Sequence, residues 1–309
     1  MERYGETLKL TLFGRSHGPL VGMTMTGLPS GLAVDAEKLQ TFLNRRAPGR
    51  APWSSPRRED DVPEFLSGLK DGKTTGGPLT AVIRNRDANP SDYENLKSVP
   101  RPGHADYPAS VKYGPDGIES GGGRFSGRMT APLCVAGGLC RQFLEELGIS
   151  VSARVLSVGP VSDSSAWTSP VPEEGFPAAD PEAGKRMIEW ILQKKAEGDS
   201  CGGVIECRID GLPAGIGGPL FGGMESRISE IVFAIPAVKG IEFGDGFRLA
   251  ERTGSESNDA FCVKDGKILT ETNHCGGLLG GMTDGMPVLF RVAVKPVPSV
   301  SVPQKSVDL

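Results

Sequence analysis

Three histidines are the residues of this chain best suited to proton chemistry near neutral pH. His17, His104 and His274 each lie in a glycine-bearing segment, which could hold an imidazole on a rigid turn beside a ligand. The alternative is that they are unrelated surface or capping residues. No His-x-x-His or His-Glu-x-x-His spacing occurs, which argues against a metal site.

Arginines gather in three short segments, 45–50, 57–61 and 121–128. Arg57-Arg58 precede three acidic residues, and this pattern predicts a solvated, salt-bridged face. The segment Gly121-Gly122-Gly123-Arg124-Phe125-Ser126-Gly127-Arg128 instead predicts an anion site at the start of a helix. It matches neither the Walker A motif nor the dinucleotide-binding fingerprint.

Charge is unevenly distributed along the chain, whose net charge is −4. Residues 1–128 carry +3, with 12 of the 20 arginines, and the remainder carries −7. Aromatic residues make up only 6% of the chain, so stacking surfaces for single-stranded nucleic acid are not expected. We therefore predict a small phosphorylated or carboxylated ligand rather than a nucleic acid.

Regular elements should position these residues. The alternation over 8–13 and 20–26 predicts two strands, and the turn 14–18 between them carries His17. Asp35 is a good N-cap for a helix that ends at Arg46. Further helices are expected over 128–147 and 180–195, the second with Asp180 as N-cap, and a surface loop over 162–179.

An internal repeat is visible in the sequence. Gly27-Leu28-Pro29-Ser30-Gly31 follows a predicted strand, and Gly211-Leu212-Pro213-Ala214-Gly215 follows another at 204–209. A helix is expected after each, over 35–46 and about 224–233. This order indicates an internally duplicated fold, and we predict a single compact α+β domain over residues 1–309.

Cysteine usage and the N-terminal residues bear on the compartment. None of the six cysteines forms a Cys-x-x-Cys pair, and Cys134 and Cys140 fall in an apolar helical pattern typical of core thiols. The N-terminus is polar, with no apolar signal segment, and no apolar run is long enough to span a membrane. We expect a cytoplasmic protein without membrane partners.

The segments together resemble one family, chorismate synthase, over essentially the whole chain. The matching segments, in order, are 14–18, 45–49, 57–60, 66–77, 85–93, 101–107, 121–128, 198–203, 238–247, 273–281 and 295–299. Ten or more ordered motifs at the family's spacing are highly specific.

The resemblance implies a reaction and a fold. The family eliminates phosphate from 5-enolpyruvylshikimate 3-phosphate in a 1,4-anti sense to give chorismate, the last step of the shikimate pathway. It requires reduced FMN without net redox change, and NADPH can serve as reductant. The implied fold is a β-α-β sandwich with two antiparallel sheets around helices, and the implied assembly is a homotetramer.

Site residues also follow from the resemblance. His17 corresponds to the acid that protonates the flavin or the leaving phosphate, and His104 to the residue that stabilises the anionic reduced flavin. The substrate ligands would be Ser16, Arg46, Arg101, Ser126, Gly127 and Arg128. The cofactor ligands would be Arg46, Arg124, Phe125, Ser126, Pro236, Ala237, Gly280, Lys295, Pro296, Val297, Pro298 and Ser299. For His274 a structural role is expected.

Several positions depart from the family pattern. Arg15 replaces the usual Glu, Pro52 stands where an arginine is usual, Phe125 and Gly127 interrupt a Ser-Ser-Ala-Arg sequence, and Ala88 replaces Gln. The family continues past its Lys-Pro-x-x-Ser motif with an Arg-His-Asp-Pro segment, which is expected to lie outside this sequence. Two alternatives stay open: a catalytically impaired paralogue that binds flavin or a phosphorylated ligand, and an NAD(P)H–flavin oxidoreductase.

Overall fold

A computed structural model describes residues 2–55, 57–87, 98–114, 117, 120–167 and 175–309. The expected family segment 85–93 and the expected loop 162–179 both extend outside the described residues. The Cα positions divide the chain into two compact units. Unit 1 comprises Met1–Phe143, Glu197–Asp199 and Pro298–Leu309, and unit 2 comprises Leu144–Ala196 and Ser200–Val297. The single domain expected from the sequence stays a prediction.

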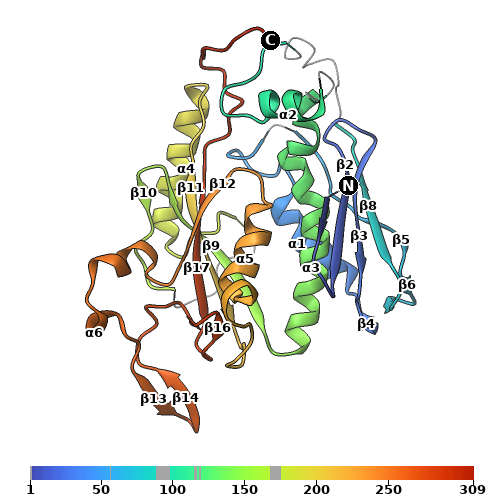
Figure 1. The fold of residues 1–309 in the computed structure, drawn as a ribbon. Helices are drawn as coiled ribbons and strands as arrows, with labels where there is room; N and C mark the ends of the chain where they lie inside the picture. Colours follow the sequence, from blue (N-terminus) through green and yellow to red (C-terminus); the bar gives the residue numbers. More distant parts are fainter. Residues whose placement is uncertain (1, 56, 88–97, 115–116, 118–119, 168–174) are drawn as a thin grey trace. The chain divides into compact units, whose positions relative to one another are not determined.

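Unit 1 contains a five-stranded antiparallel sheet in the order β1-β2-β3-β8-β5 and a smaller sheet in the order β4-β7-β6 (Figure 1). Its strands are β1 (Glu2–Tyr4), β2 (Lys9–Gly14), β3 (Leu20–Thr26), β4 (Ser30–Ala33), β5 (Glu64–Ser67), β6 (Leu69–Lys70), β7 (Lys73–Thr75) and β8 (Leu79–Arg84). Its helices are α1 (Ala36–Arg46), α2 (Asp106–Tyr113), the 3₁₀ helices η3 (Ser120–Phe125) and η4 (Gly127–Met129), and most of α3 (Thr130–Glu146).

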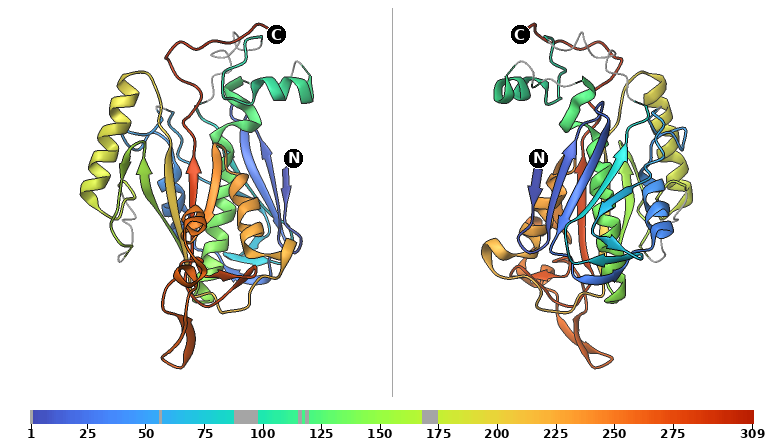
Figure 2. Two further views of the ribbon diagram at one scale, coloured as in Figure 1. Left: turned by 60° about the vertical axis from the view of Figure 1, so that its left-hand side comes forward. Right: turned by 90° about the vertical axis from the view of Figure 1, so that its right-hand side faces the viewer.

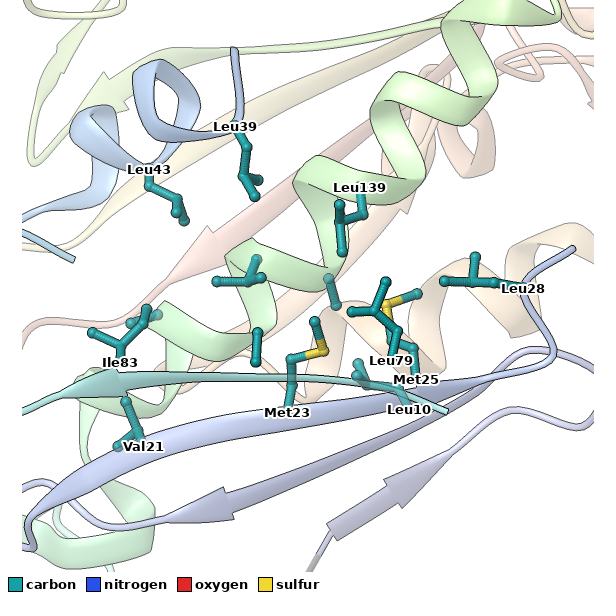
Figure 3. Packing of buried hydrophobic residues seen from close by; sticks show 14 residues of the cluster. Leu10, Val21, Met23, Met25, Leu28, Leu39, Leu43, Leu79, Ile83 and Leu139 are labelled. Atoms are coloured by element: carbon teal, nitrogen blue, oxygen red, sulfur yellow. The ribbon is translucent and has the colours of Figure 1, made fainter. Parts of the chain in front are cut away.

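The core of unit 1 lies between the larger sheet and helices α1 and α3. Leu39 and Leu43 of α1 and Leu139 of α3 point toward Met23 and Ile83 of the sheet (Figure 3). The expected N-cap of α1 is confirmed, because the Asp35 side chain accepts a hydrogen bond from the Lys38 N–H at 2.9 Å. The expected core thiols are confirmed too: Cys134 and Cys140 pack against this core, and burial raises the pKa of both.

Glycine allows the two helices to approach closely. A Cβ atom at Gly138 of α3 would lie 2.5 Å from a methyl carbon of Leu39 and 3.0 Å from the ring of Phe42. A larger residue would therefore push α1 away from α3.

Unit 2 has a second five-stranded antiparallel sheet, in the order β10-β9-β11-β17-β12. Its strands are β9 (Ser150–Val158), β10 (Val161–Ser162), β11 (Gly203–Asp210), β12 (Val238–Phe243) and β17 (Val288–Val294), with hairpins β13 (Phe261–Lys264)–β14 (Lys267–Thr270) and β15 (Leu278–Leu279)–β16 (Met282–Thr283). Its helices are α4 (Pro181–Ala196), η5 (Leu220–Gly222), α5 (Met224–Phe233), η6 (Gly246–Glu251) and α6 (Gly254–Ser257). Helix α4 runs along β9 and β10 (Figure 2).

Four strands of the two larger sheets have the same order, since β2-β3-β8-β5 corresponds to β9-β11-β17-β12, and this supports the internal duplication. The fifth strands differ, because β1 precedes β2 whereas β10 follows β9. Thr74 donates its hydroxyl hydrogen to the proline carbonyl of Gly27–Gly31 (2.6 Å) and accepts the N–H that follows that segment (3.0 Å). Thr283 makes the same two bonds to Gly211–Gly215, at 2.6 and 2.9 Å. The hairpins that carry these threonines, β6–β7 and β15–β16, share the same register. The α+β class with antiparallel sheets is confirmed.

Candidate active site

The first part of the site is an Arg–His–Asp triad at the start of α2. Asp106 accepts hydrogen bonds from Arg101 Nε (2.8 Å) and from the Arg101 backbone N–H (3.0 Å), and its Oδ1 lies 2.5 Å from His104 Nδ1. Burial alone would raise the pKa of Asp106, but the hydrogen bonds from Arg101 and His104 outweigh it and lower the pKa far below its usual range. The ionised carboxylate therefore fixes the imidazole in one orientation.

The other ring nitrogen of His104 faces a glycine. A Cβ atom at Gly122 would lie only 3.0 Å from Nε2, so a side chain there would crowd this edge of the ring, and Arg101 Nη2 lies 3.3 Å from the same nitrogen. Arg101 also donates from Nη1 to the Ser299 hydroxyl at 2.9 Å. A cavity of about 480 Å³ is lined by Arg101, Pro102 and residues 298–304. The structure thus brings together Arg101, His104 and Ser299.

The second part of the site surrounds the turn that carries His17. Arg57 donates to the Ser16 hydroxyl (3.0 Å) and the Ser16 carbonyl (3.1 Å), and its Nη2 lies 2.7 Å from Glu59 Oε1. The Glu59 side chain is 1% exposed. Burial opposes its ionisation, but hydrogen bonds from the Arg86 N–H and from Arg57 lower its pKa. The solvated, salt-bridged face predicted for this run is confirmed for the exposed Arg58 and Asp60, but it is wrong for Glu59, whose buried carboxylate pairs with the partly buried Arg57. This pair holds the residue before the half-buried His17.

The third part is a buried cluster in which Asp61 joins two arginines. Its carboxylate accepts hydrogen bonds from Arg46 and from Arg128. Arg128 also donates from Nε to Asn85 Oδ1 (2.8 Å), and the Asn85 amide donates to the Gly18 carbonyl (2.8 Å). Arg128 Nη2 is buried and has no hydrogen-bond partner among the described residues. An anion that accepted this N–H would satisfy it.

The predicted anion segment forms η3 and η4. The Ser126 hydroxyl caps η4 by accepting the Arg128 N–H at 3.2 Å, and Gly127 is exposed beside it. Arg124 lies over the Tyr113 ring, 4.9 Å from its centroid, and Phe125 packs against the same ring at 6.4 Å. Ser16 and this segment are tied together, because the Ser16 N–H donates to the Gly123 carbonyl at 3.2 Å.

The remaining predicted cofactor residues lie in unit 2. Lys295 donates its backbone N–H to the Ala237 carbonyl at 2.9 Å, which brings together the segments 236–237 and 295–297. Ala237 has a φ of 71°, a conformation that residues with side chains rarely adopt. Within this unit, Gly280 does not lie beside the segments 236–237 and 295–297. Its neighbour Gly281 accepts the N–H at the start of α5, whereas Ala237 follows the end of that ten-residue helix, about 15 Å away.

His274 belongs to a different Arg–His–Asp triad in unit 2. Asp245 Oδ2 lies 2.7 Å from both His274 Nδ1 and Arg252 Nη1, and the His274 N–H donates to Asp259 at 2.8 Å. These contacts join the turn after β12 to the segment before β15, which fits the structural role expected for His274.

Four residues of the site were not predicted from the sequence: Arg57, Glu59, Asp61 and Asn85. Three of them lie in the family-like segments 57–60 and 85–93, whereas for Asp61 the signal was a run of acidic residues within a region of net positive charge. In the part of the chain that the structure describes, no group of acidic, histidine or cysteine side chains could hold a metal ion. None of the described helices combines the length and apolar character needed to span a bilayer.

Comparison with known proteins identifies the family. Residues 8–309 match the family model for chorismate synthase. Curated chorismate synthases from Thermococcus gammatolerans and Lancefieldella parvula are 46% and 43% identical to the chain, over 99% of it and over 86% and 85% of their own lengths. A crystal structure of chorismate synthase superimposes with a TM-score of 0.77 at 28% identity, covering 95% of this chain and 85% of that one. The chain belongs to the chorismate synthase family.

Proposed function

We propose that the chain catalyses the family's reaction, the 1,4-anti elimination of phosphate from 5-enolpyruvylshikimate 3-phosphate to give chorismate, as the last step of the shikimate pathway in the cytoplasm. The observation that carries the proposal is the Nη2 of the buried Arg128, which forms no hydrogen bond with any described residue and has the Glu59 carboxylate 3.8 Å away. It is a charged donor held ready for an anion, within a cluster that also contains Arg46 and Asp61.

Substrate binding would use the arginines of unit 1. Arg128 and Arg46 would hold the phosphate, with Ser16, Ser126 and Gly127 nearby, and Arg101 would hold a carboxylate or phosphate oxygen. Fixed guanidinium groups stabilise charge as it develops on a leaving phosphate, and they do so without reorganising. The elimination breaks the C–O bond to phosphate and removes one hydrogen from the ring, so the substrate is neither oxidised nor reduced.

Reduced FMN fits the residues present. The cavity beside Arg101 and Ser299 is large enough to admit part of a cofactor, and His104 lies next to it through its contact with Arg101 Nη2 at 3.0 Å. When bound, reduced FMN would lend electron density to the substrate as phosphate leaves. We propose that it is held by Arg124, Phe125, Ser126, Pro236, Ala237, Gly280, Lys295, Pro296, Val297, Pro298 and Ser299. NADPH is the reductant we propose, with Arg46 among its contacts.

The two histidines would divide the proton chemistry. Asp106 holds Nδ1 of His104, and Nε2, which lies 3.3 Å from Arg101 Nη2, would stabilise the anionic form of the cofactor together with that arginine. His17 follows Ser16 on a turn clamped by Arg57, and it would donate a proton to the flavin or to the leaving phosphate. We also propose a homotetramer, as in the family.

An anaerobic assay tests the proposal. The 309-residue chain is mixed with 5-enolpyruvylshikimate 3-phosphate and photoreduced FMN, and chorismate absorbance is followed; a second arm replaces photoreduction by NADPH. We expect chorismate in the first arm. Flavin binding without chorismate would contradict the proposal and favour an impaired paralogue, for which the exposed Arg15 at the family's Glu position is the first residue to revert. NADPH consumption without substrate would favour a flavin oxidoreductase.

A further inference from the structure

We propose that Asp61 is the positioning residue of the phosphate site: it fixes the two guanidinium groups that would hold the leaving phosphate, without touching the substrate. The inference rests on the proposed function. The Asp61 side chain is 0% exposed, and it pairs with Arg128 (2% exposed) and Arg46 (19% exposed).

Both oxygens of Asp61 are used. Oδ1 accepts from Arg128 Nη1, and Oδ2 accepts from Arg46 Nη1. The two arginines come from different elements, since Arg46 ends α1 and Arg128 lies in η4. One carboxylate therefore sets the separation of two cations that would otherwise repel each other in a buried setting.

A second contact on each arginine fixes its orientation. Arg46 donates from Nε to Thr130 Oγ1 at 3.1 Å, and Arg128 donates from Nε to Asn85 Oδ1 at 2.8 Å. A planar guanidinium held at two nitrogens cannot rotate, so the direction of its remaining N–H groups is determined. For Arg128 the remaining nitrogen is Nη2, which lies 3.8 Å from Glu59 Oε2 and forms no hydrogen bond with any described residue.

The charges around Asp61 leave an excess of one. Three arginines, Arg46, Arg57 and Arg128, face the two carboxylates Asp61 and Glu59, and the net positive charge makes the cluster attractive to a phosphate. In Asp61→Asn one oxygen would remain to accept from one arginine, but an NH2 group would face the other, so the bridge between the two guanidinium groups would be lost. The substrate would still be held by its other contacts, among them Arg101, so the loss of geometry around its phosphate should appear in kcat rather than in KM, whereas free phosphate has only this cluster to hold it.

The backbone at Asp61 allows a clean test. Asp61 has a φ of 52°, a left-handed conformation that asparagine tolerates better than most residues with side chains. Asp61→Asn therefore removes the charge with little backbone strain. Asp60→Asn is the matched control, because Asp60 is the next residue, its side chain is 60% exposed, and it pairs with the exposed Arg86.

The experiment measures kcat and KM of the wild-type chain, Asp61→Asn and Asp60→Asn with reduced FMN under anaerobic conditions. We expect kcat of Asp61→Asn to fall about 100-fold with KM within about threefold, and Asp60→Asn to match wild type. Asp61→Glu, which keeps the charge but moves it by one methylene, should recover part of the loss. Equal kcat/KM for Asp61→Asn and Asp60→Asn would overturn the inference, as would a loss confined to melting temperature.

A second measurement covers the cases in which Asp61→Asn does not fold or the wild-type chain makes no chorismate. Inorganic phosphate should raise the melting temperature of the wild-type chain and of Asp60→Asn, and the rise should be at least halved in Asp61→Asn and in Asp61→Glu. Equal rises in all folded variants would overturn the role of Asp61. A wild-type chain that binds phosphate but forms no chorismate would contradict the proposed reaction and leave the phosphate result as the test of Asp61.

Discussion

The two units have related sheets and turns, but their charged side chains are arranged differently. Both have a five-stranded sheet in which four strands follow the same order, and both have a threonine that hydrogen-bonds to a Gly-Leu-Pro-x-Gly turn. In unit 2 the charged side chains form a ladder across four neighbouring strands, in which each charge meets the opposite charge. The ladder consists of Arg154, Glu206, Arg291 and Glu242.

In unit 1 the charges of the buried arginine cluster lie on turns and helix ends instead. Arg46 and Arg128 share one carboxylate, and one nitrogen of Arg128 is left without a hydrogen bond among the described residues. A ladder in which every charged side chain is paired stabilises a sheet, whereas an arginine cluster with an N–H group that forms no hydrogen bond can bind an anion. The same fold therefore carries a ladder of paired charges in one unit and the candidate phosphate site in the other, and the difference lies in the loops.

The two Arg–His–Asp triads give the largest expected difference. Replacing His104 by Ala should lower turnover by about 100-fold or more, as for loss of an acid–base group. His274→Ala, in the triad of unit 2, should leave turnover within about threefold of wild type. His17→Ala should lower turnover by about the same factor as His104→Ala. Steady-state turnover with folded protein checks all three, and equal losses in His104→Ala and His274→Ala would erase the distinction between the triads.

Arg128→Ala tests whether the buried cluster serves the substrate. We expect KM for 5-enolpyruvylshikimate 3-phosphate to rise about 30-fold, because a charge-assisted contact is lost, while the dissociation constant of FMN changes by less than about threefold. Kinetics and flavin fluorescence titration provide the two numbers. Arg208→Ala, which breaks a half-exposed pair with Asp210, is the control. Equal losses of substrate and flavin affinity would contradict the assignment.

Acid should weaken the triad of unit 1. The pKa of Asp106 is lowered in the folded chain, so its contribution to stability is fully present above the ordinary pKa of aspartate, about 3.9, and is lost as the pH falls below that value. We expect Asp106→Asn to be about 2 kcal/mol less stable than wild type at pH 7 and closer to wild type near pH 3. Urea unfolding at the two pH values measures this, and a difference that grew on acidification would contradict it.

The equivalent threonines of the two units should contribute equally to the stability of the fold. Thr74→Val and Thr283→Val each remove the same two hydrogen bonds from a buried hydroxyl. We expect each to lower the free energy of unfolding by about 1–2 kcal/mol and to leave turnover close to wild type. Urea unfolding compares the two, and a large loss from one with none from the other would weaken the case for duplication.

Local patterns in the sequence predicted the strands, helices and repeated turns well. The strand over 20–26, the helix that begins after Asp35 and the repeated Gly-Leu-Pro-x-Gly turns were all visible from periodicity, capping and spacing. The helix expected over 128–147 begins two residues later, because Arg128 lies in a 3₁₀ turn.

The carboxylates of the site could not be predicted in the same way. Asp61 meets one arginine 15 residues before it and another 67 residues after it. Nothing in the local run of acids distinguishes the buried Asp61 and Glu59 from the exposed Asp60 between them. Only the tertiary pairing of distant segments separates a solvated carboxylate from one that holds the site.

The most direct test of the central claim, that the arginine cluster of unit 1 receives the leaving phosphate, is a crystal structure with 5-enolpyruvylshikimate 3-phosphate and oxidised FMN bound. We predict a phosphate oxygen about 3 Å from Arg128 Nη2, with Asp61 still bridging Arg128 and Arg46. A phosphate bound elsewhere, with Arg128 Nη2 still unpaired, would contradict the account.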